Sequence, residues 1–168
     1  MARLVVLAGL PAVGKSSIAR ELARRTGAIW LRIDAMDQAI WNSGTAPEDL
    51  RDWTYRAGQA VAADNLALGH DVIADCVNDC REAREGWDEC ARRAGADVVW
   101  LEIRCSDTIE HRRRVETRQS DVEGLSLPDW KAVTARDYQP WDRHRHTIDT
   151  SDHSIERCVE EALGVLAT

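Results

Sequence analysis

Long hydrophobic runs are missing from this sequence of 168 residues. No window approaches the ~20 apolar residues that a membrane-spanning helix requires. The first apolar run, residues 4–8, is too short for the hydrophobic region of a signal peptide. A net positive charge is also absent: 29 acidic residues outnumber 22 basic ones and give a formal net charge of −7, whereas binding to long nucleic acid draws on a basic face. We therefore expect a cytoplasmic protein whose partner is neither a membrane nor a long nucleic acid.

Cysteine pairs of the C-x-x-C type are absent, and the number of cysteines, five, is odd. These features predict reduced thiols, most of them buried as small hydrophobic side chains. The less favoured alternative is a zinc site, because the spacing of its candidate ligands differs from the usual zinc patterns. Those candidates are Cys76, Cys80, His144, His146 and His153.

The strongest functional signal is the stretch of residues 9–16, which matches G-x-x-x-x-G-K-[ST] at every fixed position. It lies between an apolar run and an amphipathic segment. Glycines at positions 9 and 14 permit backbone conformations in which successive N–H groups point at an anion, and the helix N-terminus adds partial positive charge. The pattern predicts a phosphate-binding loop, with a glycine-rich structural turn as the alternative. Its residues are Gly9, Leu10, Pro11, Ala12, Val13, Gly14, Lys15, Ser16 and Ser17.

Strands and helices are predicted to alternate along the whole chain. Strands are expected at 4–8, 28–33, 70–75, 97–103 and 147–149, and helices at 14–25, 35–41, 45–68, 79–94, 111–118, 126–138 and 155–166. Capping boxes are expected at Thr45 with Glu48, next to Pro47, and at Asp107 with Glu110. This alternation predicts one α/β domain over residues 1–168, with a parallel sheet covered on both faces.

Acidic residues close two of the predicted strands, at the sheet edge where ligands of such folds bind. Asp34 is expected to accept the proton of a substrate hydroxyl or to orient it; the alternative is an N-cap of the following helix. Asp37, one turn later, is a weaker candidate for substrate binding, and a position behind the site or on the surface is the more favoured alternative. Asp75 is expected to hold Mg²⁺ together with Ser16, the alternative being a turn or capping aspartate.

Polar residues after the third strand and a basic helix complete the predicted site. Asn78 and Arg81 could bind a polar substrate, although Arg81 can equally be a solvated helix charge. Residues 112–118 hold the densest positive charge of the chain. Arg114 and Arg118 are i,i+4 neighbours on one helix face, so they could close over a triphosphate as part of a lid at about 106–127. A solvated face paired with nearby glutamates is the alternative.

On these residues the chain resembles the small P-loop kinases, a group that includes gluconate kinase, adenylylsulfate kinase, chloramphenicol phosphotransferase, zeta toxins and the kinase domain of phage polynucleotide kinase. The resemblance spans nearly the full length and rests on GLPAVGKSS, RIDAMD, VIADCVN and RRRVETR. It implies a three-layer P-loop fold with a five-stranded parallel sheet and a helical lid. It also implies ATP and Mg²⁺ as cofactors, Lys15 and Asp34 as catalytic residues, Arg114 and Arg118 as lid arginines, and adenine near residues 149–152.

Tryptophan occurs seven times, whereas phenylalanine does not occur. Trp30 and Trp100 lie in predicted strands and are expected in the core. Trp41 and Trp53 flank the region where P-loop kinases bind the acceptor, so they could form the wall of that pocket. Core packing is the more favoured alternative for both.

The interpretation favoured by these features is an ATP-dependent kinase that phosphorylates a hydroxyl of a small-molecule acceptor. A regulatory GTPase would carry the guanine-reading N-K-x-D, which neither Lys15 nor Lys131 provides. A mechanochemical ATPase of the AAA+ type would need a further helical domain. A toxin-like kinase acting on a nucleotide sugar and a non-catalytic nucleotide-binding module stay open. Nothing in the sequence distinguishes a monomer from a dimer.

Overall fold

The computed structural model describes residues 1–44, 50 and 52–167. Within these residues the strands are β1 (Arg3–Ala8), β2 (Ile29–Arg32), β3 (Val72–Asp75), β4 (Asp97–Arg104) and β5 (His146–Asp149). They form one sheet in the order β2-β3-β1-β4-β5, and every neighbouring pair is parallel. The predicted α/β fold with a five-stranded parallel sheet is confirmed, and β1, which leads into the glycine-rich loop, is its central strand.

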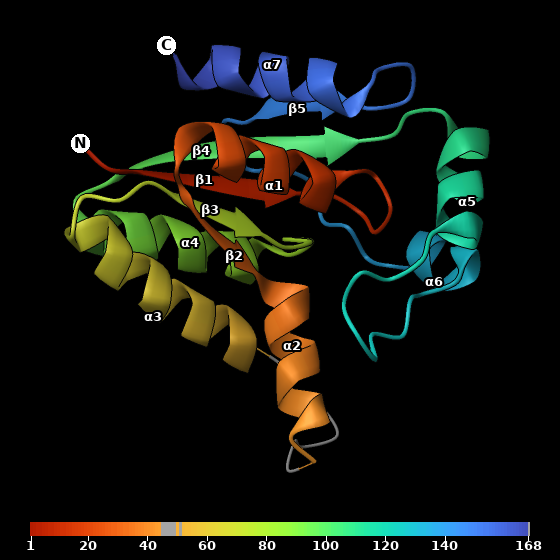
Figure 1. The fold of residues 1–168 in the computed structure, drawn as a ribbon, viewed down its shortest axis with the longest axis horizontal. Coiled ribbons are helices and arrows are strands. Elements are labelled where there is room, and N and C mark those ends of the chain that lie inside the picture. The colour runs from red at the N-terminus through yellow and green to blue at the C-terminus, as the bar shows by residue number, and fades with distance from the viewer. Residues whose placement is uncertain (45–49, 51, 168) are drawn as a thin grey trace.

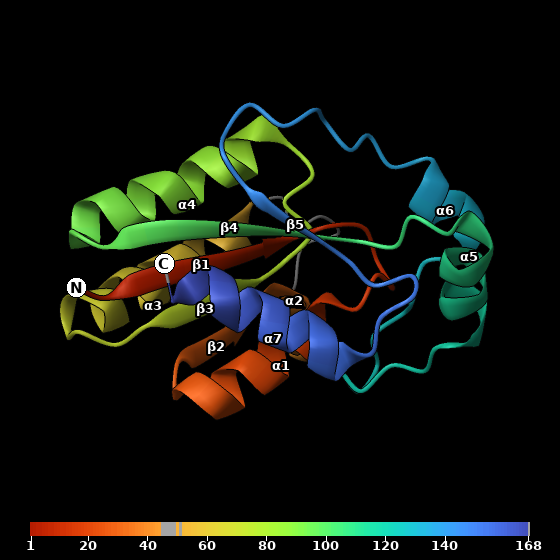
Figure 2. The same cartoon turned by 90° about the horizontal axis from the view of Figure 1, so that it is seen from above.

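The described helices are α1 (Lys15–Thr26), α2 (Ile33–Asn42), α3 (Trp53–Ala67), α4 (Arg81–Ala94), α5 (Thr108–Thr117), α6 (Trp130–Thr134) and α7 (Ile155–Leu166). Figure 1 shows α1 and α7 on one face of the sheet and α3 and α4 on the other, which makes three layers. Both α5 and α6 lie beyond the carboxyl ends of the strands (Figures 1 and 2). None of the helices in the described part of the chain is long and apolar enough to cross a bilayer.

The sheet separates two hydrophobic cores, and β1 contributes to both. Leu4 and Val6 pack in the core under α3 and α4, which also contains Trp87. Val5 and Leu7 pack in the core under α1 and α7. Successive side chains of a strand point to opposite faces, so a strand covered on both sides is an unbroken apolar run, as residues 4–8 are.

Several element boundaries differ from the prediction. Helix α2 already begins at Ile33, and its N-cap residue is Arg32, without a side-chain cap. Asp34 therefore lies within the first turn, so the alternative in which it caps this helix is wrong. Helix α3 begins at Trp53 instead of position 45. The predicted capping box and proline, Thr45, Glu48 and Pro47, lie outside the described residues.

The helix predicted at 126–138 is reduced to one short helix, α6, capped by Asp129. Arg84 of α4 binds the chain a few residues after the end of α6. Its guanidinium group is fully buried and lies 4.2 Å from the ring centre of Trp141. It donates hydrogen bonds of 2.8–3.2 Å to four backbone carbonyls, those of Asn78, Asp79, Gln139 and Pro140. Arg84 thus ties the segment after α6 to the loop after β3.

We expect Arg84→Leu to lower the stability of the fold without changing its topology. The substitution removes four hydrogen bonds and leaves the carbonyl oxygens of Asn78, Gln139 and Pro140 without a donor among the described residues, whereas that of Asp79 keeps the N–H of Gln139. The cost is about 3 kcal/mol, which for a chain of this size lowers Tm by ~6–12 °C. Thermal unfolding followed by circular dichroism measures it. The matched control is Arg92→Leu on the same helix, because the Arg92 side chain is 72% exposed and should count for little. Equal Tm values for the two variants would contradict this role of Arg84.

Candidate active site

The loop between β1 and α1 has the backbone of an anion-binding nest. Gly9, Ala12 and Gly14 have φ values of 138°, 67° and 103°, a left-handed region that is sterically costly for side chains. A Cβ at Gly9 would lie 2.2 Å from the carbonyl oxygen of Ile103, so β4 itself excludes any larger residue there. Ala12 adopts this conformation although it is not a glycine, a detail that the motif does not indicate.

Lys15, the first residue of α1, is almost completely buried, with 9% of its surface exposed. Its Nζ donates a hydrogen bond of 2.9 Å to the carbonyl oxygen of Leu10. Burial lowers the pKa of this ammonium group, while the negative charges of Asp75 and Asp34 oppose the shift. An ammonium group held in this way is a strong local charge for a phosphate that enters the loop.

Asp75 ends β3 directly beside the loop, as predicted, and is 3% exposed. Burial raises the pKa of its carboxyl group, and Lys15 and a hydrogen bond with Ser16 oppose that shift. The indole Nε1 of Trp30 lies 3.3 Å from its Oδ2. A hydroxyl and a carboxylate side by side are hard oxygen ligands, which Mg²⁺ prefers. The residues present therefore fit the predicted magnesium site.

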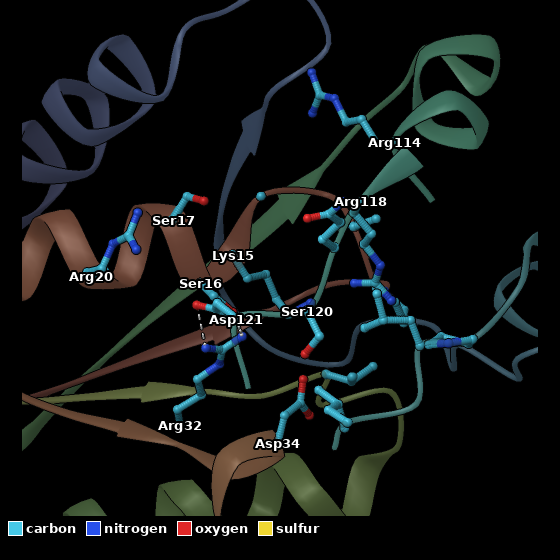
Figure 3. A pocket seen from close by; sticks show the side chains of 18 of the residues that line it. Lys15, Ser16, Ser17, Arg20, Arg32, Asp34, Arg114, Arg118, Ser120 and Asp121 are labelled. Carbon is cyan, nitrogen blue, oxygen red and sulfur yellow. Dashed lines mark hydrogen bonds and ion pairs between the residues drawn. The ribbon is translucent and has the colours of Figure 1, made fainter. Parts of the chain in front are cut away.

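A cleft of about 860 Å³ opens in front of the loop. Figure 3 shows Lys15, Ser16, Asp34 and Arg118 facing it from different elements. Its walls come from the phosphate-binding loop, from α2, from α5 with the segment that follows, and from the start of α7. The lining includes most of the predicted site residues: Pro11, Ala12, Gly14, Lys15, Ser16, Ser17, Asp34, Asp37, Trp41, Arg114 and Arg118.

Helix α2 supplies the acidic wall of this cleft. Asp34, Asp37 and Trp41 succeed one another at spacings of three and four residues, so they share one face of the helix. Burial raises the pKa of Asp37, and a hydrogen bond with the buried Thr54 opposes the shift. Trp41 remains 43% exposed, so it lines the cleft instead of filling the core.

The two predicted lid arginines lie in different surroundings, although both reach the cleft. Arg114 donates to Glu110 and to both oxygens of Thr150, with distances of 2.7–2.8 Å. Arg118 points into the cleft (Figure 3), and its buried Nε has no hydrogen-bond partner among the described residues. Burial lowers the pKa of Arg118, and Asp34 opposes that shift.

Three predicted substrate or nucleotide contacts are placed elsewhere. Asn78 is fully buried: it donates to the carbonyl oxygen of Leu7 and accepts from the indole of Trp87, so its amide faces the core instead of the cleft. Arg81 pairs with Asp142 at 2.9 Å outside the cleft lining. Residues 149–152 do not line the cleft either, whereas the next three residues, His153, Ser154 and Ile155, do.

Other residues of the site were not found from the sequence. Arg32 forms a bidentate pair with Asp121 at 2.8 and 2.9 Å, which joins the end of β2 to the loop after α5. Arg136 lines the cleft and pairs with Asp79 at 2.6 Å. His111 on α5 contacts the carbonyl oxygen of Pro11 at 2.9 Å. A usable signal was the helix face shared by positions 111, 114 and 118.

Comparisons with known proteins agree with this geometry. A profile for a family described as an AAA domain matches residues 4–137. An uncharacterised protein of Mycobacterium tuberculosis is 30% identical over 178 residues, which cover 97% of this chain and 34% of that protein. A shikimate kinase of Frankia casuarinae is 29% identical, covering 97% of this chain and 73% of the kinase. The solved APS kinase CysC of M. tuberculosis, in complex with AMPPNP and APS, matches with a TM-score of 0.72 and 20% identity, over 99% and 98% of the two chains.

These similarities establish the fold of the chain, and its reaction has to be inferred from the residues of the cleft. The fold is that of a P-loop kinase, which agrees with the resemblance drawn from the sequence motifs. The chain spans about a third of the length of the mycobacterial relative.

We expect Asp75→Asn to make the protein more stable at neutral pH. A raised pKa means that the folded state favours the protonated form. The stability contributed by this group is therefore present below its ordinary pKa of 3.8 and is lost as the pH rises through its raised value in the folded protein. Removing the charge should raise Tm at pH 7.5, and the gain over the wild type should shrink as the pH is lowered toward 4.

Thermal melts across this pH range measure the effect. The control is Asp97→Asn at an exposed position of β4, which should leave the pH profile of Tm as it is in the wild type. A Tm of Asp75→Asn below that of the wild type throughout this range would show that the hydrogen bonds of the carboxylate outweigh the desolvation of its charge.

Proposed function

Because the chain belongs to the AAA domain family and has the fold of a P-loop kinase, we propose that it is an ATP-dependent phosphotransferase whose acceptor is the hydroxyl group of a small molecule. The observation that supports the proposal most strongly is the shared cleft. A phosphate-binding loop with a buried Lys15 and a carboxylate, Asp34, on the opposite wall face the same 860 Å³ space.

The nucleotide would bind across the loop and the start of α7. The loop amides and Lys15 would hold the phosphates, as in other helix N-terminal anion sites. His153 and Ile155 line the cleft at its other end, close to the loop after β5, and are suited to contact a flat base. Ser16 and Asp75 would hold Mg²⁺, which neutralises charge on the phosphates when it is bound.

The acceptor would bind between α2 and the loop that follows α5. Asp34 would align the acceptor hydroxyl and take its proton while the oxygen attacks the γ-phosphorus. The bond from the γ-phosphorus to the bridging oxygen then breaks, and ADP leaves with that electron pair. Lys15 and the guanidinium of Arg118, whose Nε has no partner among the described residues, would stabilise the charge on the transferring group. Arg32 paired with Asp121 would hold the neighbouring loop over the acceptor and exclude water.

A nucleotide-binding module without catalysis would share the loop but would not need Asp34. The family description alone does not separate the two. The placement of Asp34 in the cleft that Lys15 also lines favours phosphotransfer, because a site for nucleotide binding alone gains nothing from a carboxylate on the acceptor wall.

Lys15→Ala is expected to abolish turnover, because it removes the buried positive charge that faces the phosphates. Release of ADP, measured in a coupled assay with an active acceptor, should fall to background. Lys131→Ala provides the control, since Lys131 lies on α6 and does not line the cleft. Unchanged ADP release by Lys15→Ala would refute the proposed role of the loop.

Asp34→Asn should lower kcat by ~10²–10⁴-fold if the carboxylate is a general base, with the affinity for ATP close to that of the wild type. The acceptor is first identified by a coupled ADP-release screen of sugars, nucleotide sugars, aminoglycosides, chloramphenicol-like alcohols and nucleosides. Asp64→Asn, at an exposed position of α3, is the matched control. Full activity of Asp34→Asn would exclude a catalytic role for this carboxylate, and ATP binding without any acceptor-dependent ADP release would favour the nucleotide-binding module.

A further inference from the structure

Two carbonyl oxygens of the phosphate-binding loop are held from behind by buried side chains of distant segments. We propose that His111 and the pair Arg114–Thr150 are positioning residues that aim the backbone amides of Ala12 and Gly14 at the phosphates. The inference rests on the proposed function in one respect only: it assumes that the loop binds a nucleoside triphosphate.

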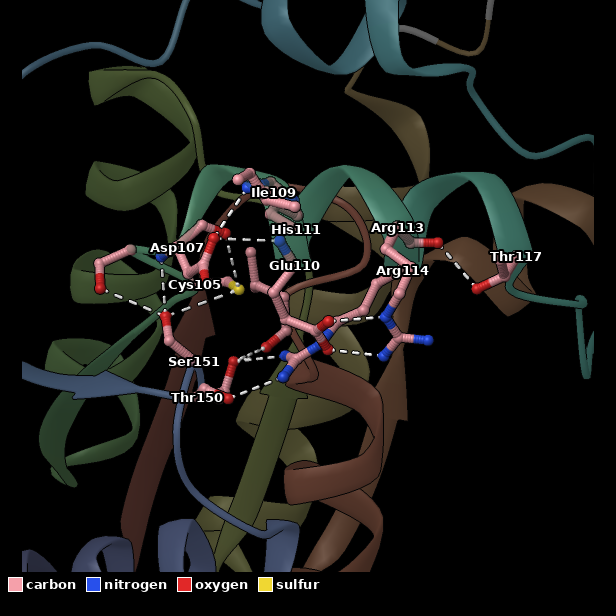
Figure 4. A network of polar contacts seen from close by, with 12 residues as sticks. Cys105, Asp107, Ile109, Glu110, His111, Arg113, Arg114, Thr117, Thr150 and Ser151 are labelled. Atoms are coloured by element: carbon pink, nitrogen blue, oxygen red, sulfur yellow. Dashed lines mark hydrogen bonds and ion pairs between the residues drawn. The ribbon is translucent and has the colours of Figure 1, made fainter.

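Thr150 links the loop after β5 to the phosphate-binding loop. It is fully buried, and its Oγ1 lies 2.8 Å from the carbonyl oxygen of Val13 and 2.8 Å from Nη1 of Arg114. The backbone N–H of Thr150 donates to the carbonyl oxygen of Arg104, also at 2.8 Å. Figure 4 shows Arg114 reaching Thr150 from α5.

The direction of these hydrogen bonds follows from the chemistry of the groups. A guanidinium group only donates, so the hydroxyl of Thr150 must accept from Arg114. Its single proton is then available for a carbonyl, and that of Val13 is closer than that of Arg104, at 2.8 Å against 3.0 Å. The charge of Arg114 polarises the hydroxyl and strengthens the bond to Val13.

His111 acts on the same loop one turn earlier along α5. Its Nε2 lies 2.9 Å from the carbonyl oxygen of Pro11. Since a carbonyl only accepts, this nitrogen must carry the proton. The ring is 6% exposed and packs edge-on against Trp130, with ring centres 5.2 Å apart. Packing against Trp130 holds the imidazole ring in place, and the hydrogen bond from the ring holds the carbonyl of Pro11.

Planarity of the peptide bond converts these contacts into amide directions. In a trans peptide, the C=O of one residue and the N–H of the next point in opposite directions, and no peptide bond of the described residues is cis. Holding the carbonyl of Pro11 toward α5 therefore turns the N–H of Ala12 away from α5. Holding the carbonyl of Val13 toward Thr150 likewise turns the N–H of Gly14 away from Thr150. Both residues line the cleft, where a phosphate would meet these amides.

Residues on one side of α5 and at its C-terminus thus contact both the back of the phosphate-binding loop and the cleft in front of it. His111 and Arg114 lie at i and i+3 on one side of α5, and Arg118 is the C-cap residue that directly follows the helix. The first two hold the phosphate-binding loop from behind, and the third enters the cleft from the front. The loop conformation and the position of Arg118 are therefore set by a single rigid element.

The test compares variants that keep or lose the donor of each contact. Thr150→Val removes the hydroxyl at nearly constant shape and should weaken ATP binding by about 10-fold, whereas Thr150→Ser should stay within about threefold of the wild type. His111→Met should weaken it as well, while His111→Gln retains a donor and should rescue binding. Calorimetry with MgATP gives each Kd, and inorganic tripolyphosphate, as a competitor, should lose affinity by the same factor as ATP.

Thr147→Val is the matched control, because Thr147 lies on β5 three residues before Thr150, and its hydroxyl contacts Glu102 and not the phosphate-binding loop. It should bind ATP as the wild type does. Folded Thr150→Val and His111→Met that bind ATP within twofold of the wild type would overturn the inference, and so would an equal loss in Thr150→Ser and Thr150→Val. A wild type that binds MgATP but phosphorylates no alcohol would refute the proposed function alone, since every readout here is a binding constant.

Discussion

The candidate site depends on the burial of two opposite charges, those of Lys15 and Asp75, at the carboxyl edge of the sheet. Burial is the largest cause of the pKa shift of each group, and each is the largest favourable charge for the other. The attraction between the two charges offsets only part of the cost of burying them. β1 and β3 are neighbours in the sheet, with Leu7 opposite Asp75 in the register, so the end of β3 lies beside the loop that carries Lys15. The same low-dielectric surroundings make the site responsive to the charge of a phosphate.

The region predicted as a lid divides into two parts with different contacts. Helix α5 is fastened to the phosphate-binding loop through His111 and to the loop after β5 through Arg114. The segment after α5 instead contacts the end of β2 and helix α2, where Asp121 pairs with Arg32 and the carbonyl of Glu123 accepts from Asn42. Under the proposed function, the contacts of α5 would support the nucleotide side of the cleft and those of the following loop the acceptor side.

Predictions from the sequence were accurate where a short pattern dictates the backbone. The fold class, the strand that leads into the loop and the position of Asp75 at the end of β3 all follow from local runs of apolar residues and glycines. Asn78 shows where such reasoning fails. Its left-handed φ of 52° turns the side chain into the core, toward Trp87, and no spacing rule indicates that turn.

By itself, the sequence determined that the chain forms a parallel α/β sheet, that residues 9–16 form a loop with the shape of a phosphate-binding loop and that Asp75 stands at the end of a strand. Tertiary structure alone decided which side chains complete the cleft. Arg118 lines it, whereas Asn78 is buried in the core. Thr150 and His111 bind carbonyl oxygens of the phosphate-binding loop from segments more than 90 residues away in the sequence. The physical reason is the separation along the sequence of the residues that interact. Backbone conformation and hydrophobic periodicity are local properties, whereas hydrogen bonds between distant segments exist only after the strands and helices have packed.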